Sequence, residues 1–180
     1  MPSAGLRLLN EHFQTSVPHI FAAGDVTGPP ALASTSMRQA RIAVARAFDV
    51  SSATSPRQLP YGVYTIPEVG TIGETGASLV ERAVPYIVGR AHYESNARGR
   101  IIGDACGFLK LLFDRNDRKL LGVHVIGEQA TELVHLGMMA MLAGFTADTI
   151  AEACFNTPTL GELYAAAAFD AIRKPNEGDK

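Results

Sequence analysis

The pattern of apolar and polar positions divides the chain into two parts of different character. In the first 50 residues, a short apolar run ends at Gly24-Asp25, and a helix is predicted from about Leu32 to Phe48. We expect small and apolar residues to form the packed side of this helix and arginines to form the opposite side. The packed side comprises Leu32, Ser36, Ala40, Ala43, Val44 and Ala47, the opposite side comprises Arg38, Arg41 and Arg46, and Ile42 falls among the arginines.

Residues 51–60 are rich in Ser, Thr and Pro, and we interpret them as a linker between residues 1–50 and 61–180. Beyond the linker, short runs of β-branched and aromatic residues broken by turn residues predict strands. The expected strands cover residues 61–66, 69–73, 85–93, 107–114 and 119–127, with a short helix over 74–82. The last two strands flank a polar turn at 115–118, which predicts a hairpin.

Three further helices are expected over residues 128–142, 146–153 and 159–172. Strands followed by helices in this order are typical of an α+β fold. The second part of the chain is therefore predicted to hold an antiparallel sheet with helices on one face.

Composition and charge narrow the class of protein. With 180 residues, of which 47% are hydrophobic, the chain can form one sizeable core or two small domains. The net charge of −2 offers no electrostatic footprint for nucleic acid or for an anionic membrane. No apolar run reaches transmembrane length, and the start of the chain lacks the order of a signal peptide, so we expect a soluble cytoplasmic protein.

The two cysteines do not form a recognisable site. Cys106 and Cys154 have no close-spaced partner, so their spacing predicts neither a disulfide framework nor a zinc site. We expect free thiols, buried or chemically idle, in a reducing compartment, and we predict no metal site.

The first candidate binding site lies where the apolar run ends. A strand ending at Gly24-Asp25 would place a small backbone and a carboxylate at the carboxyl edge of a sheet, where α/β proteins bind ligands. The helix that opens at Leu32-Ala33 would present its free N–H groups and positive dipole end to an electron-rich ligand. Taken by itself, however, a Gly-Asp pair is more often an ordinary strand-to-turn exit in which Asp caps a helix, so the flanking residues decide the interpretation.

The segment Thr15–Val26, followed by Leu32-Ala33-Ser34 and Gln39-Ala40-Arg41, resembles the second FAD-contacting motif of the pyridine nucleotide–disulfide oxidoreductase family. The resemblance implies that Asp25, which follows Gly24, hydrogen-bonds the ribityl chain of the flavin. It also implies that Leu32 and Ala33 lie under the isoalloxazine ring, where the helix dipole would stabilise negative charge during reduction.

Other parts of that family's enzymes do not occur in this sequence. Family members begin with a Gly-x-Gly-x-x-Gly loop for FAD, followed by a redox cysteine pair and a separate nicotinamide domain, and none of these is found here. The resemblance therefore implies that residues 1–50 are the remnant of an FAD-binding α/β domain with an incomplete FAD site. The missing N-terminal FAD and NAD(P) domains would have been cut away or would belong to another chain.

Residues 61–180 resemble the dimerisation domain of the same family, which implies a homodimer. The matching segments are Tyr64–Glu68, Val69-Gly70 with Ile72–Thr75, Gly107–Leu111, Leu121–Gly127 with Ala130–Leu133, and Pro158-Thr159 with Glu162. Five such segments in the right order and spacing are specific, although each alone is weak.

The second candidate site surrounds Thr157, Pro158 and Glu162. Disulfide reductases of the family carry His before this Pro-Thr pair, and the Glu orients that imidazole so that it moves protons for a substrate at the partner subunit's flavin. Thr157 has no group that titrates near neutral pH, so we treat the three residues as a remnant of an active site across the dimer and assign no catalytic residue.

Loss of the proton shuttle favours hydride transfer over disulfide reduction, because hydride transfer needs no general base. The pattern most resembles the transhydrogenase branch of the family, which implies hydride transfer between NADPH and NAD through FAD. Two alternatives stay open: a non-catalytic dimerisation module, or part of a dihydrolipoamide dehydrogenase-like reductase that lacks the catalytic His. The isolated chain is expected to be inactive.

Overall fold

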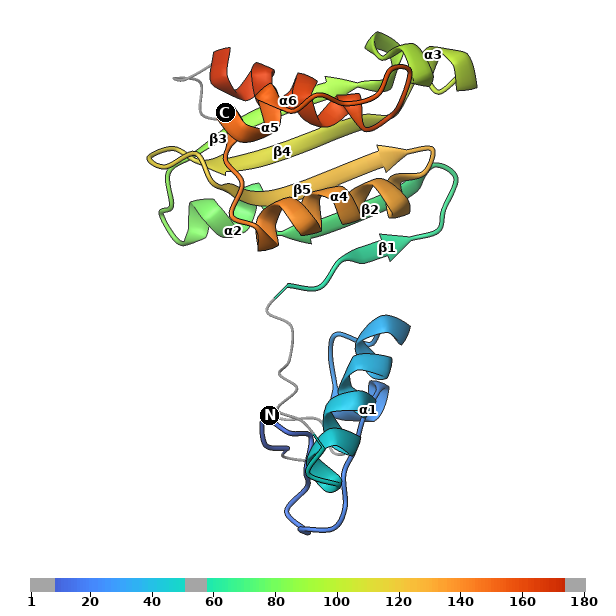
Figure 1. Ribbon diagram of the computed structural model, residues 1–180, viewed down its shortest axis with the longest axis vertical. Coiled ribbons are helices and arrows are strands. Elements are labelled where there is room, and N and C mark those ends of the chain that lie inside the picture. The colour runs from blue at the N-terminus through green and yellow to red at the C-terminus, as the bar shows by residue number, and fades with distance from the viewer. Residues whose placement is uncertain (1–8, 51–57, 174–180) are drawn as a thin grey trace. The chain divides into compact units, whose positions relative to one another are not determined.

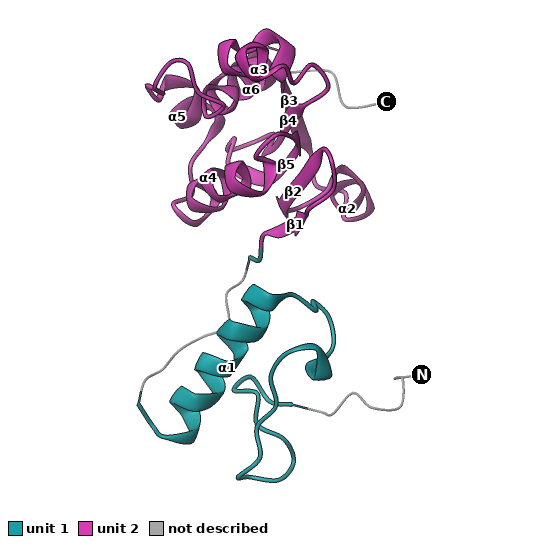
Figure 2. Cartoon of the chain, turned by 90° about the vertical axis from the view of Figure 1, so that its right-hand side faces the viewer, with its two compact units in different colours: residues 1–59 teal, residues 60–180 magenta. Residues whose placement is uncertain are grey.

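The computed structural model describes residues 9–50 and 58–173. Its contacts divide the chain into two compact units, Met1–Leu59 and Pro60–Lys180 (Figure 2). Each unit is described by itself below. Most of the expected linker, residues 51–57, lies outside the described residues, so the assignment of 51–60 as a linker stays a prediction.

One long helix, α1 (Ala33–Ala47), organises the first unit and confirms the helix predicted there. Its packed side differs from our expectation: Thr35, Gln39, Ile42 and Ala43 are buried, whereas Val44 is 56% exposed. The loop that lies against α1 supplies the reason, since the Gly24 amide donates a 2.7 Å hydrogen bond to Gln39 Oε1. The helix therefore turns its amide acceptor, and not its row of small residues, toward the loop.

The strand expected before Gly24 is also absent from the described residues. Phe21 makes only an isolated bridge to Gln14, and Asp25 begins a single 3₁₀ turn, η1 (Asp25–Thr27). A strand becomes stable only when neighbouring strands satisfy its backbone groups, and the described part of this unit offers a single bridge.

The second unit is built on a five-stranded antiparallel sheet with the order β1-β2-β5-β4-β3 (Figure 1). The predicted strands and the hairpin between the last two are confirmed. The strands are β1 (Tyr61–Val63), β2 (Glu68–Gly73), β3 (Tyr86–His92), β4 (Phe108–Asp114) and β5 (Leu120–Gly127).

Helices cover mainly one face of this sheet, which confirms the α+β fold class. The covering helices are α4 (Ala130–Leu142), α5 (Ala147–Glu152) and α6 (Glu162–Arg173), and all three lie on the same side in Figure 2. The short α2 (Gly76–Glu81) lies on the other side, where Leu79 packs against Val88 and Leu112.

The sequence pattern missed two short elements after β3. They are η2 (Tyr93–Ser95) and α3 (Ala97–Ile102), which Asn96 caps by accepting a hydrogen bond from the Gly99 amide at 3.0 Å. A six-residue helix with Gly in its first turns has too short a period to stand out in the sequence.

The main core lies between the sheet and helices α4 to α6, and two glycines bring helices close to strands. A Cβ at Gly89 of β3 would lie 1.8 Å from the carbonyl oxygen of Ala167 in α6, and one at Gly70 of β2 would lie 2.3 Å from that of Ala130. The outer edge of β3 is also bound to α6, because the Arg90 amide donates to the Asp170 carboxylate at 3.0 Å. These contacts fix α6, which begins at Glu162.

Candidate functional site

The turn that leads into α6 brings together the residues predicted as an active-site remnant. The Thr157 hydroxyl donates a 2.6 Å hydrogen bond to Glu162 Oε1, and the Thr159 amide donates to Oε2 at 3.1 Å. The Thr157–Pro158 peptide bond is cis. Glu162 is the first residue of α6, where the helix dipole favours a negative charge.

These contacts determine the chemistry that the turn can perform. The hydrogen bonds from Thr157 and then from Thr159 lower the pKa of Glu162, so the carboxylate is ionised at neutral pH. Thr157 is exposed, and its hydroxyl donates a hydrogen bond to the Glu162 carboxylate. Neither side chain is therefore arranged to take up a proton near neutral pH.

A surface groove of about 1000 Å³ adjoins this turn. Glu162 and Phe155 contribute to its lining, together with His92 and Arg100 from the region of β3 and α3, and Cys154. Cys154 and Cys106 are both free, and both are exposed rather than buried. No sequence pattern predicted the groove, because its lining residues come from segments separated by some 60 positions.

The residues predicted to contact a flavin lie in the first unit. Gly24 has a φ of +86°, a conformation that favours glycine, and the exposed Asp25 follows it directly. Leu32 caps α1 without a side-chain hydrogen bond, and Ala33 is the first helical residue. The assignment of these four residues to a cofactor stays a prediction.

Two observations at the start of α1 fit a polar ligand there. The helix lacks a side-chain cap, which leaves N–H groups of its first turn available. The Thr35 hydroxyl is buried without a hydrogen-bond partner among the described residues. Buried polar groups are usually paired, so an unpartnered hydroxyl in the first turn of an uncapped helix is consistent with a missing binding partner.

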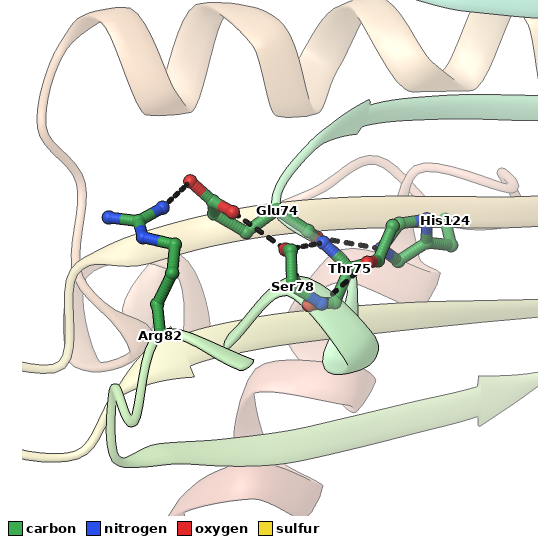
Figure 3. Close-up of polar contacts among 5 residues, drawn as sticks. All are labelled: Glu74, Thr75, Ser78, Arg82 and His124. Atoms are coloured by element: carbon green, nitrogen blue, oxygen red, sulfur yellow. Dashed lines mark hydrogen bonds and ion pairs between the residues drawn. The ribbon is translucent and has the colours of Figure 1, made fainter. Parts of the chain in front are cut away.

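A polar cluster on the other face of the sheet fastens α2 to β5 (Figure 3). His124 Nε2 lies 3.0 Å from the carbonyl oxygen of Glu74. The other ring nitrogen, Nδ1, lies 2.6 Å from the Thr71 hydroxyl. Because a carbonyl only accepts, Nε2 carries the proton in the neutral ring. Burial lowers the pKa of His124, and the Lys110 ammonium lowers it further against the opposing effect of the Glu74 carbonyl.

The carboxylate of Glu74 completes this cluster. It accepts a 2.7 Å hydrogen bond from Ser78, whose own amide is capped by Thr75, and it forms an ion pair with Arg82 (Figure 3). The contacts of the cluster hold the connection between β2 and α2 against β5, so we assign the cluster a structural role.

Two of the family-like segments noted above, Tyr64–Glu68 and Ala130–Leu133, contact each other at the start of α4. The Glu68 carboxylate accepts hydrogen bonds from the Thr131 amide at 3.1 Å and from the Thr131 hydroxyl at 2.6 Å. Glu68 thereby satisfies an amide of the first helical turn from a strand 63 positions away in the sequence.

Among the described residues, no group of three or more His, Cys, Asp or Glu side chains is placed to hold a metal ion. The described helices include none that is long and apolar enough to cross a membrane.

The fold and a match to a known family together define the class of protein. Residues 59–168 match the family model described as the pyridine nucleotide-disulphide oxidoreductase dimerisation domain, which amounts to more than half of the chain. The chain belongs to this family, and its second unit corresponds to the family's dimerisation domain.

Within that class, the chain is similar to particular enzymes. The soluble pyridine nucleotide transhydrogenase of Mycobacterium tuberculosis (strain ATCC 25177 / H37Ra) is 46% identical over 170 residues, which cover 94% of this chain and 36% of the relative. The soluble pyridine nucleotide transhydrogenase of Marinomonas sp. (strain MWYL1) is 41% identical over 175 residues, covering 96% and 38%. The chain thus spans little more than a third of the length of these relatives.

Solved structures agree with the fold. LpdA from Mycobacterium tuberculosis superposes with a TM-score of 0.81 at 26% identity, covering 89% of this chain and 35% of LpdA. The HOCl-induced flavoprotein disulfide reductase RclA from Escherichia coli gives a TM-score of 0.86 at 22% identity, covering 93% of this chain and 39% of RclA. At that identity, RclA supports the fold alone.

Proposed function

We propose that this chain is the FAD-contacting and dimerising C-terminal portion of a cytoplasmic NAD(P) transhydrogenase. The observation that carries the proposal is the hydrogen bond from Thr157 to Glu162, because neither of these two side chains is arranged to take up a proton near neutral pH. Hydride transfer between nicotinamides needs no group that takes up a proton, whereas reduction of a disulfide does. The names of the two transhydrogenase relatives support the same reaction.

The residues of the first unit would have a binding role. FAD, when bound, would supply the hydride-carrying chemistry between NADPH and NAD. The exposed Asp25 would accept hydrogen bonds from hydroxyl groups of the cofactor, and the uncapped start of α1 at Leu32 and Ala33 would stabilise negative charge. Thr157, Pro158 and Glu162 would complete the site of a second copy.

That second copy would cover an apolar side of α4. Met139 and Leu142 are 60% and 64% exposed, and the neighbouring Leu136 is 45% exposed. Exposed large apolar side chains at helical spacing favour a protein interface. A homodimer would bury them, and a shared two-fold axis would place the same residues on both sides of the contact.

A second candidate function is a dimerisation module without catalysis. This function is favoured because the second unit has its own sheet, covering helices and hydrophobic core. In the chain alone, the glycine-rich FAD loop and the nicotinamide domain do not occur, so we expect the chain alone to oxidise no NADPH.

An experiment on reconstitution separates these functions. The N-terminal two thirds of the M. tuberculosis transhydrogenase would be expressed as a separate polypeptide, mixed with this chain and FAD, and assayed for hydride transfer from NADPH to an NAD analogue. We expect transfer in the mixture, none with either polypeptide alone, and loss of bound flavin absorbance with Asp25→Ala. A mixture that forms a complex, retains flavin and reduces lipoamide but no NAD analogue would overturn the transhydrogenase assignment; a colourless, inactive chain that still dimerises would favour the module.

A further inference from the structure

The hydroxyl of one buried tyrosine reaches the backbone of α4 from α6. Tyr164 is 2% exposed, and its Oη donates a 2.7 Å hydrogen bond to the carbonyl oxygen of Leu133. Tyr164 Oη also accepts a 3.1 Å hydrogen bond from the Gly137 amide. Leu133 and Gly137 are four residues apart, so they are the acceptor and donor that pair with each other in a regular helix. Tyr164 therefore bridges one step of the hydrogen-bond ladder of α4.

Glycine at position 137 makes this approach possible. A Cβ at Gly137 would lie 3.0 Å from the Tyr164 hydroxyl and 2.6 Å from a methyl group of Val123. The hydroxyl also keeps its proton, because burial raises the pKa of Tyr164. The phenol is thus a permanent donor to Leu133, and the bridge does not depend on pH in the physiological range.

The bridge joins the two parts of the unit to which the proposed function gives a role. Tyr164 stands two residues after Glu162 on α6, and Gly137 stands between Leu136 and Met139 on α4. Leu136 also lies over the turn before α6, since a Cβ at Gly161 would be 3.8 Å from its methyl group. The Thr157–Glu162 turn and the apolar side of α4 are therefore connected through Tyr164.

We infer that Tyr164 is a positioning residue, whose hydroxyl sets the direction in which α4 presents Met139 and Leu142 to a second copy. This inference rests on the proposed function, because the second copy is proposed there. A side chain inserted into the ladder of a helix is a known cause of bending. Without the hydroxyl, Leu133 and Gly137 lose the hydrogen-bond partner that ties this step of α4 to α6, and the half of α4 beyond Gly137 is no longer held in its direction relative to the start of α6.

The test compares Tyr164→Phe with the matched control Tyr93→Phe in the 180-residue chain. Tyr93 is fully buried, and its hydroxyl also donates to a carbonyl, that of Glu128 at 3.0 Å, but this carbonyl precedes α4. Sedimentation equilibrium gives the dimer dissociation constant, and ¹⁵N NMR spectra report on the Gly137 amide. We expect Tyr164→Phe to raise the dissociation constant roughly tenfold and to shift the Gly137 resonance, whereas Tyr93→Phe changes neither.

A second variant perturbs the same bridge from the side of α4. Gly137→Ala keeps the Tyr164 ring but excludes its hydroxyl from the backbone, so the inference requires that it weaken the dimer as well. A wild-type chain that stays monomeric would overturn the proposed homodimer and this inference with it. A dimeric Tyr164→Phe chain with the dissociation constant of Tyr93→Phe would overturn the inference alone.

Discussion

The Thr157 hydroxyl and the Glu162 carboxylate form a hydrogen bond of 2.6 Å that closes the turn before α6. The hydrogen-bond partner of Glu162 is therefore a hydroxyl group, which neither gains nor loses a proton near neutral pH. The same carboxylate caps the turn through the Thr159 amide, so an ionised Glu162 serves the fold even where no imidazole is present.

Thr157→Val should raise the pKa of Glu162. The variant keeps the branched shape of the side chain but removes the hydrogen bond that contributes most to the lowering of this pKa. Carboxyl-detected ¹³C NMR across a pH titration measures the effect. Thr157→Ser is the control, because it retains the hydroxyl and should retain the lowered pKa; an unchanged pKa in Thr157→Val would contradict the assignment.

The His124 cluster predicts a loss of stability in mild acid. Burial lowers the pKa of His124 below its ordinary value of 6.5, so below pH 6.5 the unfolded chain binds a proton that the folded chain resists. Stability should therefore fall as the pH drops from 6.5 to the lowered pKa. Urea denaturation between pH 5 and 7 measures this slope. His124→Gln, whose amide can still donate and accept, should flatten it, and a slope that persists in this variant would place the effect elsewhere.

Glu68 should stabilise the start of α4 from a distance. Glu68→Ala removes the acceptor of both Thr131 hydrogen bonds and should lower the free energy of unfolding by about 1–2 kcal/mol. Chemical denaturation measures the loss. Glu81→Ala is a suitable control, because Glu81 is exposed at the end of α2. Equal losses in the two variants would show that the cap contributes nothing.

The close approach of α6 to β3 leaves no room for a side chain at position 89. A Cβ there would overlap the backbone of Ala167, which cannot rotate away, so Gly89→Ala should cost about 3 kcal/mol or abolish folding. Gly161→Ala should be tolerated in a stability measurement, since its nearest atoms would lie 3.4 Å away. A Gly89→Ala chain as stable as Gly161→Ala would disprove the tight contact.

Charge on the exposed side of α4 should prevent pairing of two copies. Met139→Glu places a carboxylate in the proposed apolar contact and should weaken the dimer by roughly 30-fold or more. Val80→Glu provides the control, because Val80 is 68% exposed on α2, which lies on the other face of the sheet. Light scattering over a dilution series distinguishes them, and equal behaviour of the two variants would rule out α4 as the interface.

The sequence pattern predicted the second unit better than the first for a physical reason. Strands such as β4 and β5 pair with each other across a short turn, so their alternation is matched by neighbours within the chain. The segment before Gly24 has only the Gln14–Phe21 bridge, and its apolar run therefore does not become a strand. The burial of Ile42, which fell among the arginines, depends on which loop lies against α1, and no periodicity contains that information.

The candidate site was likewise predicted only in part. Thr157 and Glu162 were singled out by the resemblance to the family's His–Glu pair, whereas the hydrogen bond between them was not predicted. The bridge from Tyr164 to Leu133 and Gly137 joins residues about 30 positions apart, and it depends on a hydroxyl that a sequence pattern reads only as part of an apolar helix face.

The contact between Arg90 and Asp170 limits how copies of this chain can associate. An outer strand with unpaired amides invites further strands, which leads to aggregation. Here the Asp170 carboxylate occupies an amide in the middle of β3, while the opposite outer strand, β1, spans only three residues. Neither β3 nor β1 therefore presents a long row of backbone groups with which a strand of another chain could pair. Growth of the sheet from chain to chain is discouraged, and finite assemblies that form through helices are favoured.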